Sequence, residues 1–78
     1  MTEYVIESTS ISFYNGPIYW SGIPGEGSNW VRGLSAAEPM SRERAERLAA
    51  ALRDYELAVE VRELVEKPGY VLATKAVL

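Results

Sequence analysis

The sequence contains neither cysteine nor histidine, and each absence removes a class of function. Without cysteine there is no disulfide framework, no thiolate nucleophile and no cysteine-based metal site. Without histidine the chain lacks the commonest general base and the commonest ligand of transition metals. Nothing that remains assembles a nucleophile, a base and an oriented pocket, so we expect neither enzymatic activity nor a cofactor.

Long apolar runs and an excess of positive charge are also missing. No stretch of 18 or more apolar residues occurs, so the sequence predicts no membrane-spanning helix. The N-terminus carries an acid where a signal peptide needs a basic region, and we expect the protein to act in the cytoplasm. The net charge of −3 is unlike that of proteins that bind the nucleic-acid backbone, and it suits a basic partner surface better.

What is present is the composition of one small folded domain. The chain has 78 residues, of which 47% are hydrophobic and 24% are charged, values that are ordinary for a globular protein. This length is close to the lower limit at which a single core is sufficient. Residues 1–78 are therefore expected to form a single domain.

An amphipathic stretch from residue 41 to residue 54 predicts the only long helix. Its apolar residues recur at the i, i+3, i+4, i+7 spacing that puts them on one helix face. Ser41 is a suitable N-cap, because its hydroxyl can accept a hydrogen bond from a free backbone N–H of the first turn. The apolar stripe consists of Ala45, Leu48, Ala49 and Leu52.

The segments before this helix predict two or three strands and a turn. Residues 2–14 have the composition of a strand, with a change of phase near Ser8 or Thr9 that predicts a bulge. Asn15-Gly16 is typical of a hairpin turn and precedes a returning strand at residues 18–20. Trp30-Val31 is either a short third strand or an irregular edge. The capping-box spacing of Ser35-Ala36-Ala37-Glu38 predicts a brief helical turn.

The segments after the helix predict a second hairpin. Leu57, Val59 and Val61 alternate with polar residues or alanine, as in a half-buried strand, and Leu64-Val65 breaks the alternation. That break predicts a bulge or the end of the strand. Lys67-Pro68-Gly69-Tyr70 fits a type II turn before a last strand over residues 70–77. The last strand could pair within the chain or with another chain.

The order of these elements predicts an α+β fold. An antiparallel sheet of four to five strands, with one amphipathic helix (about residues 41–54) packed on one face, satisfies the pattern without a long crossover. The expected core consists of Ile6, Ile11, Phe13, Ala45, Leu48, Ala49, Leu52, Leu57, Val59 and Val61.

Aromatic and acidic side chains are the candidates for a binding surface. Two tryptophans and five tyrosines are many for this length, and both residue types are enriched at interfaces, although they could instead complete the core. Strand alternation would place Glu56 and Glu60 on the outward face, where carboxylates are either simply solvated or able to imitate phosphates. The expected partner-binding set is Tyr19, Trp20, Glu26, Trp30, Glu56 and Glu60.

With these residues in view, the chain resembles a class of small proteins that are common in bacteriophages and mobile elements. The resemblance spans about residues 4–61, whereas the Pro-Gly turn and the last strand depart from the pattern. Proteins of this class with a known role are often host-interaction factors, among them the anti-CRISPR inhibitors of CRISPR–Cas complexes. The matching segments are Tyr4-Val5-Ile6, Tyr19-Trp20, Trp30, the helix from residue 41 to residue 52 and Val59-Glu60-Val61.

The resulting hypothesis is a non-enzymatic protein-binding module, encoded by a phage and acting in the host bacterial cytoplasm. It would inhibit a bacterial defence complex stoichiometrically, with a CRISPR–Cas effector as partner, by covering a basic nucleic-acid-binding surface. We expect no direct nucleic-acid binding, no membrane contact, and a monomer or small homo-oligomer.

Two alternatives belong to other classes of protein. The first is a phage structural or assembly protein, or a homo-oligomer built by pairing exposed strand edges. The second is a small regulator that binds nucleic acid through the helix arginines, although these are expected by default to form a solvated helix face. The arginines concerned are Arg42, Arg44, Arg47 and Arg53.

Overall fold

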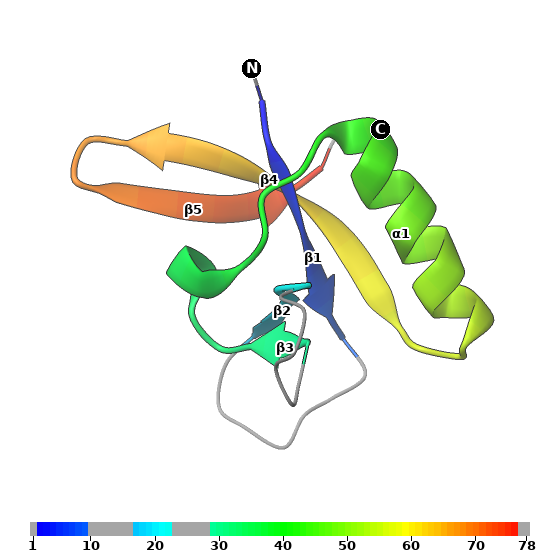
Figure 1. The fold of residues 1–78 in the computed structure, drawn as a ribbon. Helices are drawn as coiled ribbons and strands as arrows, with labels where there is room; N and C mark the ends of the chain where they lie inside the picture. The colour runs from blue at the N-terminus through cyan, green and yellow to red at the C-terminus, as the bar shows by residue number, and fades with distance from the viewer. Residues whose placement is uncertain (1, 10–16, 23–28, 77–78) are drawn as a thin grey trace.

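The computed structural model, which describes residues 2–9, 17–22 and 29–76, is an α+β fold with one antiparallel sheet and one helix (Figure 1). The sheet has five strands in the order β3-β2-β1-β4-β5, and every neighbouring pair is antiparallel. This confirms the predicted fold class. The elements are β1 (Tyr4–Ser8), β2 (Ile18–Trp20), β3 (Trp30–Val31), the 3-10 helix η1 (Leu34–Ala36), α1 (Arg42–Asp54), β4 (Val59–Lys67) and β5 (Tyr70–Lys75).

Helix α1 begins and ends where its sequence signals predict. The Ser41 side chain accepts a hydrogen bond from the backbone N–H of Arg44 at 3.2 Å, which satisfies one of the free donors of the first turn. Glu43 in the first turn and Arg53 in the last turn both suit the helix dipole. The helix stops at Tyr55, and Glu56 then takes a positive φ of 63°, the left-handed conformation that commonly follows a helix.

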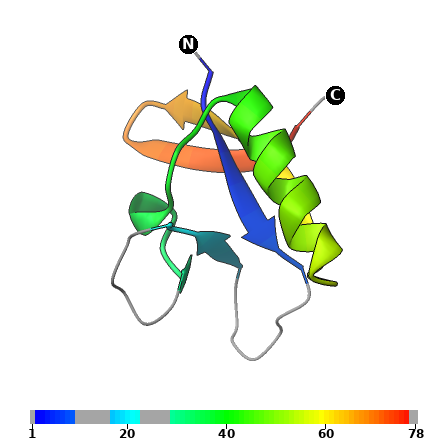
Figure 2. The same cartoon turned by 45° about the vertical axis from the view of Figure 1, so that its right-hand side comes forward.

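The main core lies between α1 and the sheet. Helix α1 lies along β1 and the first half of β4 and buries its apolar stripe there (Figure 2). Leu48 is only partly buried but packs against the same cluster, together with Leu57 and Val61. The predicted core is thus confirmed for its described members, while Ile11 and Phe13 lie outside the described residues. The buried cluster consists of Ile6, Met40, Ala45, Ala49, Leu52 and Val59.

The opposite face of the sheet is also covered, which the sequence did not predict. Val5 and Tyr19 are buried on this face against Ala37, which lies in the segment between η1 and α1. Leu34 and Leu64 pack against the same cluster from the two sides. The segment is fixed to the sheet by paired backbone hydrogen bonds between Tyr4 and Met40, of 2.8 and 2.9 Å.

The break in alternation at Leu64-Val65 is therefore neither a bulge nor a strand end. Strand β4 keeps a regular register with β1 up to Glu63 and with β5 up to Lys67, without an extra residue in either ladder. Successive strand residues point to opposite faces, so Leu64 is apolar because it faces the second cluster. The predicted bulge is wrong because it assumed that only one face of the sheet is buried.

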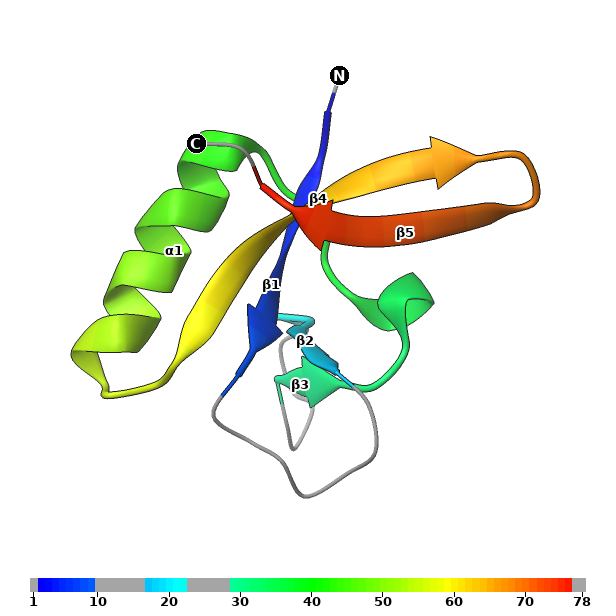
Figure 3. The same cartoon turned by 180° about the vertical axis from the view of Figure 1, so that it is seen from behind.

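Strands β4 and β5 form a hairpin whose outer half extends beyond the rest of the sheet. The hairpin turns at Pro68-Gly69, and Gly69 has the positive φ (84°) that the third position of a type II turn requires. Strand β1 pairs with β4 only as far as Glu63, so residues 64–73 project away from α1, as Figures 1 and 3 show. We call residues 64–73 the arm.

The remaining local predictions have mixed outcomes. Trp30-Val31 does form a short strand, and a brief helical turn does occur at η1. The capping box is wrong, however, because the N-cap is Gly33, two residues before Ser35, and glycine has no side chain to accept a bond. The Asn15-Gly16 turn lies outside the described residues. None of the described residues belongs to a helix long and apolar enough to cross a membrane.

Candidate functional site

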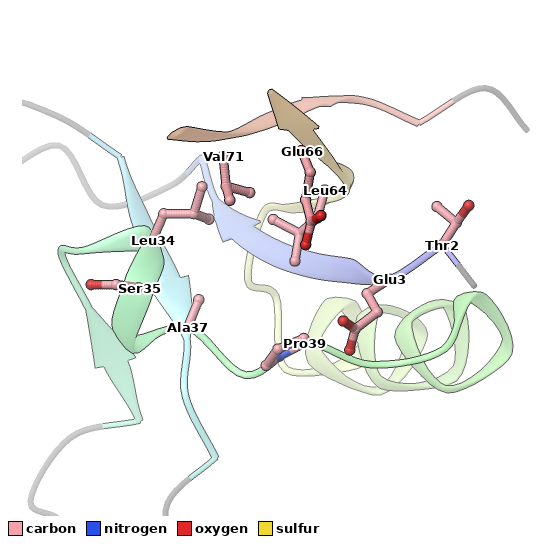
Figure 4. A pocket seen from close by; sticks show the side chains of 9 residues that line it. All are labelled: Thr2, Glu3, Leu34, Ser35, Ala37, Pro39, Leu64, Glu66 and Val71. Atoms are coloured by element: carbon pink, nitrogen blue, oxygen red, sulfur yellow. The ribbon is translucent and has the colours of Figure 1, made fainter. Parts of the chain in front are cut away.

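A groove of about 790 Å³ opens on the sheet face opposite α1 (Figure 4). Its walls come from the residues just before β1, from the segment 34–39 and from the arm. The side chains of its apolar part belong to Leu34, Ala37, Pro39, Leu64 and Val71. Thr2, Glu3, Ser35 and Glu66 line the rest of the groove, and a hollow that combines apolar and polar groups can receive a ligand or the side chain of another protein.

Backbone hydrogen bonds hold the three walls in position. The N–H of Leu64 donates to the carbonyl of Glu3 at 2.9 Å, which continues the β1–β4 ladder outwards by one step. The N–H groups of Ala36 and Ala37 donate to Gly33 and Leu34 at 3.1 Å each, which closes the turn that carries Leu34. Backbone hydrogen bonds therefore fix the residues before β1, the arm and the turn that carries Leu34.

Two carboxylates, those of Glu3 and Glu66, also line the groove. Both residues are exposed, and neither has an ion-pair partner among the described residues. Negative charge beside an apolar hollow favours a binding partner that presents an apolar side chain next to a positively charged one.

A polar row crosses the same sheet face on the inner side of the arm. Arg62 Nη2 lies 2.7 Å from a carboxylate oxygen of Glu60 and 3.4 Å from one of Glu7, while its buried Nε has no hydrogen-bond partner. Burial raises the pKa of the neighbouring Tyr19 hydroxyl, Glu7 raises it further, and Arg62 opposes the shift. Arg62 is held by both carboxylates within the chain, so the row is better suited to ordering the sheet than to binding a charged ligand.

A second, smaller hollow of about 440 Å³ lies between β2 and α1. Glu38 and Arg44 form an ion pair there at 2.8 Å, and the Glu38 backbone N–H donates to the Trp20 carbonyl at 3.0 Å. The other carboxylate oxygen of Glu38 is buried without a partner. Gly22, with a positive φ of 63°, is packed closely against this carboxylate and the Trp20 indole nitrogen. These contacts connect β2, the segment 34–39 and α1.

The structure separates the residues that the sequence analysis grouped into one binding set. Trp20 and Trp30 are half-buried on the α1 side of the sheet, with their rings perpendicular and 5.5 Å apart. Tyr19 points to the opposite face and is only 6% exposed, so the expectation that it is an exposed anchor is wrong. The Tyr19 ring is buried because it packs in the cluster with Val5 and Ala37 on this face.

The acidic members of the set are not aligned either. Glu56 follows α1 and precedes β4, so it does not share a strand face with Glu60, contrary to the predicted alternation. Both side chains are exposed, but the Glu60 carboxylate is paired with Arg62. Glu26 lies outside the described residues. A role of these residues in partner binding stays a prediction, yet the described members do not form one continuous surface.

Most of the helix arginines are engaged within the chain. Arg42 pairs with Glu46 at 3.1 Å, and Arg44 pairs with Glu38. Arg53 donates to the backbone carbonyl of Val59 at 3.0 Å and so connects the end of α1 to the start of β4. Arg47 lines the smaller hollow. The arginine face therefore offers less free positive charge than the sequence alone indicates.

Sequence reasoning missed the groove because its walls are far apart in the chain. Leu64 was the one available signal, since an apolar residue out of phase with its strand can indicate a second buried face. The described residues hold no cluster of three or more histidine, cysteine, aspartate or glutamate side chains that could bind a metal ion.

Comparison with protein-family models, with curated proteins and with solved structures finds no match.

Proposed function

We propose that this protein is a non-catalytic protein-binding module that receives apolar side chains of another protein in the groove beside the arm. The groove has an apolar lining from two separate segments, and its volume of about 790 Å³ is within the range of sites that bind small molecules or side chains. The arm that forms one wall is held by a regular β ladder. A partner would therefore meet a preformed surface, which lowers the entropic cost of binding.

The observation that carries this proposal is the exposure of apolar residues along the arm. Tyr70, Val71 and Leu72 are consecutive and are 56%, 45% and 42% exposed. Because neighbouring strand residues point to opposite faces, Val71 faces the groove while the other two face the α1 side. Val71 therefore extends the apolar lining of the groove with an exposed side chain, while Tyr70 and Leu72 add exposed apolar surface on the opposite face of the arm.

The charges favour a partner with basic residues. Glu3 lines the groove without an ion-pair partner among the described residues, and the chain carries a net charge of −3. Opposite charge on the partner would speed association and fix the orientation of binding. This is compatible with the narrower hypothesis of a phage-encoded inhibitor of a bacterial defence complex such as a CRISPR–Cas effector. Phosphate mimicry by a carboxylate row has less support, because Glu56 and Glu60 are not aligned.

A pull-down with two matched variants tests the proposal. Ser35 lines the groove and is exposed, so Ser35→Trp fills the hollow without entering the buried clusters. Ala36 is also exposed and lies in the same 3-10 helix but does not line the groove, so Ala36→Trp is the control. Tagged wild-type and variant proteins are mixed with lysate from bacteria that contain a CRISPR–Cas effector, and bound proteins are identified by mass spectrometry.

The expected result is one partner recovered in fixed ratio by the wild type and by Ala36→Trp, and lost with Ser35→Trp. Recovery of an effector subunit would support the inhibitor hypothesis, and another partner with the same variant pattern would support the groove without it. Equal recovery by all three proteins would overturn the groove as the binding site. Recovery of the bait alone would overturn the binding function in that cell.

A further inference from the structure

Strand β5 forms one outer edge of the sheet, and its free side is open. No described segment pairs with the outer side of β5, whose ladder with β4 contains no bulge. Residues 70–74 carry no charge and no proline. Natural sheets usually protect such an edge with lysine, proline, a bulge or a very short strand, because unpaired backbone groups recruit another strand. This edge is therefore equipped to pair.

The hydrogen bond between Leu64 and Glu3 shows which backbone groups of β5 are available. Because the N–H of Leu64 points towards β1, the backbone groups of its neighbours Glu63 and Val65 point towards β5. The backbone groups of the residues opposite these, Thr74 and Leu72, point back towards β4. The alternation of the ladder then turns the backbone groups of Val71, Ala73 and Lys75 towards the open edge.

Two charged residues near this edge lack ion-pair partners among the described residues. Glu66 lies on β4 directly opposite Val71, and Lys75 lies at the end of β5 opposite Arg62, a residue of like charge. All of these side chains are on the sheet face that carries the groove, since Glu66 and Val71 both line it. Within one chain, Lys75 and Glu66 are too far apart along the hairpin to be neighbours in a ladder.

We propose that two copies of this chain pair through β5 in an antiparallel, two-fold symmetric dimer centred on Ala73. In this register Ala73 faces Ala73 of the second copy, and Val71 faces Lys75 of the second copy. The outward backbone groups of both strands then meet as hydrogen-bonded pairs. Two five-stranded sheets become one continuous sheet.

Charge complementarity selects a second copy as the partner and fixes this register. Lys75 of the second copy enters the row that contains Val71 and Glu66, and its long side chain can cross Val71 to reach the Glu66 carboxylate. The two-fold axis repeats this ion pair, so both unpaired charges of each chain gain a partner. If the two-fold axis were centred one residue before or after Ala73, Lys75 of the second copy would no longer lie in the cross-strand row that contains Val71 and Glu66.

The dimer would duplicate the binding groove and narrow its arm side, because Lys75 of the second copy would lie over Val71 and pair with Glu66, which both line the groove. A two-fold axis perpendicular to the sheet keeps the same face of both copies on the same side, so the two grooves open in the same direction. Since the interface is a single pair of strands, it is small, and we expect a dissociation constant on the order of 10–100 μM. The proposal does not depend on the proposed function.

Sedimentation equilibrium with charge-reversal variants tests this register. The wild type should change from monomer to a species of twice the 8.7 kDa chain mass as its concentration rises from about 1 μM to about 1 mM. Glu66→Lys and Lys75→Glu should each raise the dissociation constant about tenfold or more, because each places like charges side by side twice. The double variant, in which the charges are exchanged, should restore the wild-type constant.

A matched charge change and single cysteines provide the controls. Asp54→Lys makes the same charge reversal on exposed helix surface and should leave the dissociation constant unchanged. Because the chain has no cysteine, Ala73→Cys introduces a unique thiol, and a short thiol cross-linker should join two copies. Tyr55→Cys, at a residue that is 80% exposed outside the sheet, should not cross-link at the same concentration.

Four results would overturn the dimer. These are a wild-type protein that remains monomeric at about 1 mM, single variants that dimerise as the wild type does, a double variant that is not restored, and assembly beyond the dimer. Loss of partner capture with Ser35→Trp while dimerisation is retained would separate the groove from this edge.

Discussion

Strand β4 passes through two different environments, and their comparison shows where this fold is stabilised and where it is available for binding. Its first half, up to Glu63, lies between β1 and α1 and carries Val59 in the main core. Its second half, beyond the hydrogen bond from Leu64 to Glu3, pairs only with β5 and forms the arm. The hydrogen-bonded ladder is equally regular in both halves. We call the described residues outside the arm the body. Burial, and not backbone regularity, therefore distinguishes the stable body from the exposed arm.

The two edges of the sheet differ in the same way. Strand β3 ends its edge after Trp30-Val31, so few unpaired backbone groups are presented there. Strand β5 presents six residues, with consecutive exposed apolar side chains. A sheet with a very short strand at one edge and a long unpaired strand at the other can add strands at the second edge only. This asymmetry favours a closed dimer over an open-ended fibre.

The comparison between body and arm is tested most strongly by the same substitution at two strand valines. Val59 is buried in the body, whereas Val71 is 45% exposed in the arm. Val59→Asp buries an unpaired charge and should cost about 3–5 kcal/mol, which is comparable with the whole stability of a domain this small. Val71→Asp should change the free energy of unfolding by less than about 1 kcal/mol.

Circular dichroism during urea unfolding measures both valine variants. We expect Val59→Asp to be unfolded or nearly so without denaturant, while Val71→Asp keeps a cooperative transition close to that of the wild type. A large loss of stability with Val71→Asp would show that the arm belongs to the cooperative core.

Alanine at the two glycines of positive φ should give the next largest difference. At Gly22 a Cβ atom would meet the Glu38 carboxylate and the Trp20 indole nitrogen, in addition to the backbone strain. At Gly69 an added Cβ atom would meet nothing within 4 Å, so only the backbone strain remains. We expect a loss of about 2–3 kcal/mol for Gly22→Ala and about 1 kcal/mol for Gly69→Ala.

Thermal unfolding checks these values, because 1 kcal/mol corresponds to about 4–8 °C in a domain of this size. Asparagine tolerates the left-handed conformation, so Gly69→Asn should recover most of the loss at the turn. Equal losses at Gly22 and Gly69 would mean that the contact of Gly22 with Glu38 adds nothing to the strain.

The sequence predicted the helix and most strands because their signals are local. Ser41, the apolar stripe and the Pro68-Gly69 turn each fix a backbone conformation within a few residues. It did not predict the second covered face, because the segment that covers it has no periodicity and is fixed by backbone pairing with Tyr4. The break in alternation at Leu64-Val65 predicts a bulge or a strand end for this reason, and the ladders show neither.

The binding surface was harder to predict than the fold for a related physical reason. The groove joins residues 2–3, 34–39 and 64–71, and only the completed sheet brings these together. The aromatic pattern was also ambiguous, since Tyr19 and Trp20 are adjacent in a strand and therefore point to opposite faces. Composition identified residues of the right type for an interface, but strand register decided which of them are accessible.

A smaller difference is expected between two side-chain hydrogen bonds. The Ser41 hydroxyl accepts from a helix N–H that has no other partner within the helix, so Ser41→Ala should cost about 1 kcal/mol. The Thr74 hydroxyl donates to the Glu63 carbonyl at the long distance of 3.4 Å. Thr74→Ala should therefore cost less than about 0.5 kcal/mol. Urea unfolding of both variants distinguishes them, and a reversed order would contradict the importance of the cap.

The smallest expected effect concerns Tyr19, the buried tyrosine of the body. Burial, together with Glu7, raises the pKa of Tyr19 above its ordinary value of 10.0, so the folded state holds the phenol proton more tightly than the unfolded state. The contribution of this group is fully present below about pH 10 and is lost as the pH rises through the raised pKa. Tyr19→Phe has no such proton, so its free energy of unfolding should fall less than that of the wild type between about pH 9 and pH 11. Tyr55→Phe, at an exposed site, is the control, and equal pH slopes for all three proteins would mean that burial does not hold the Tyr19 proton.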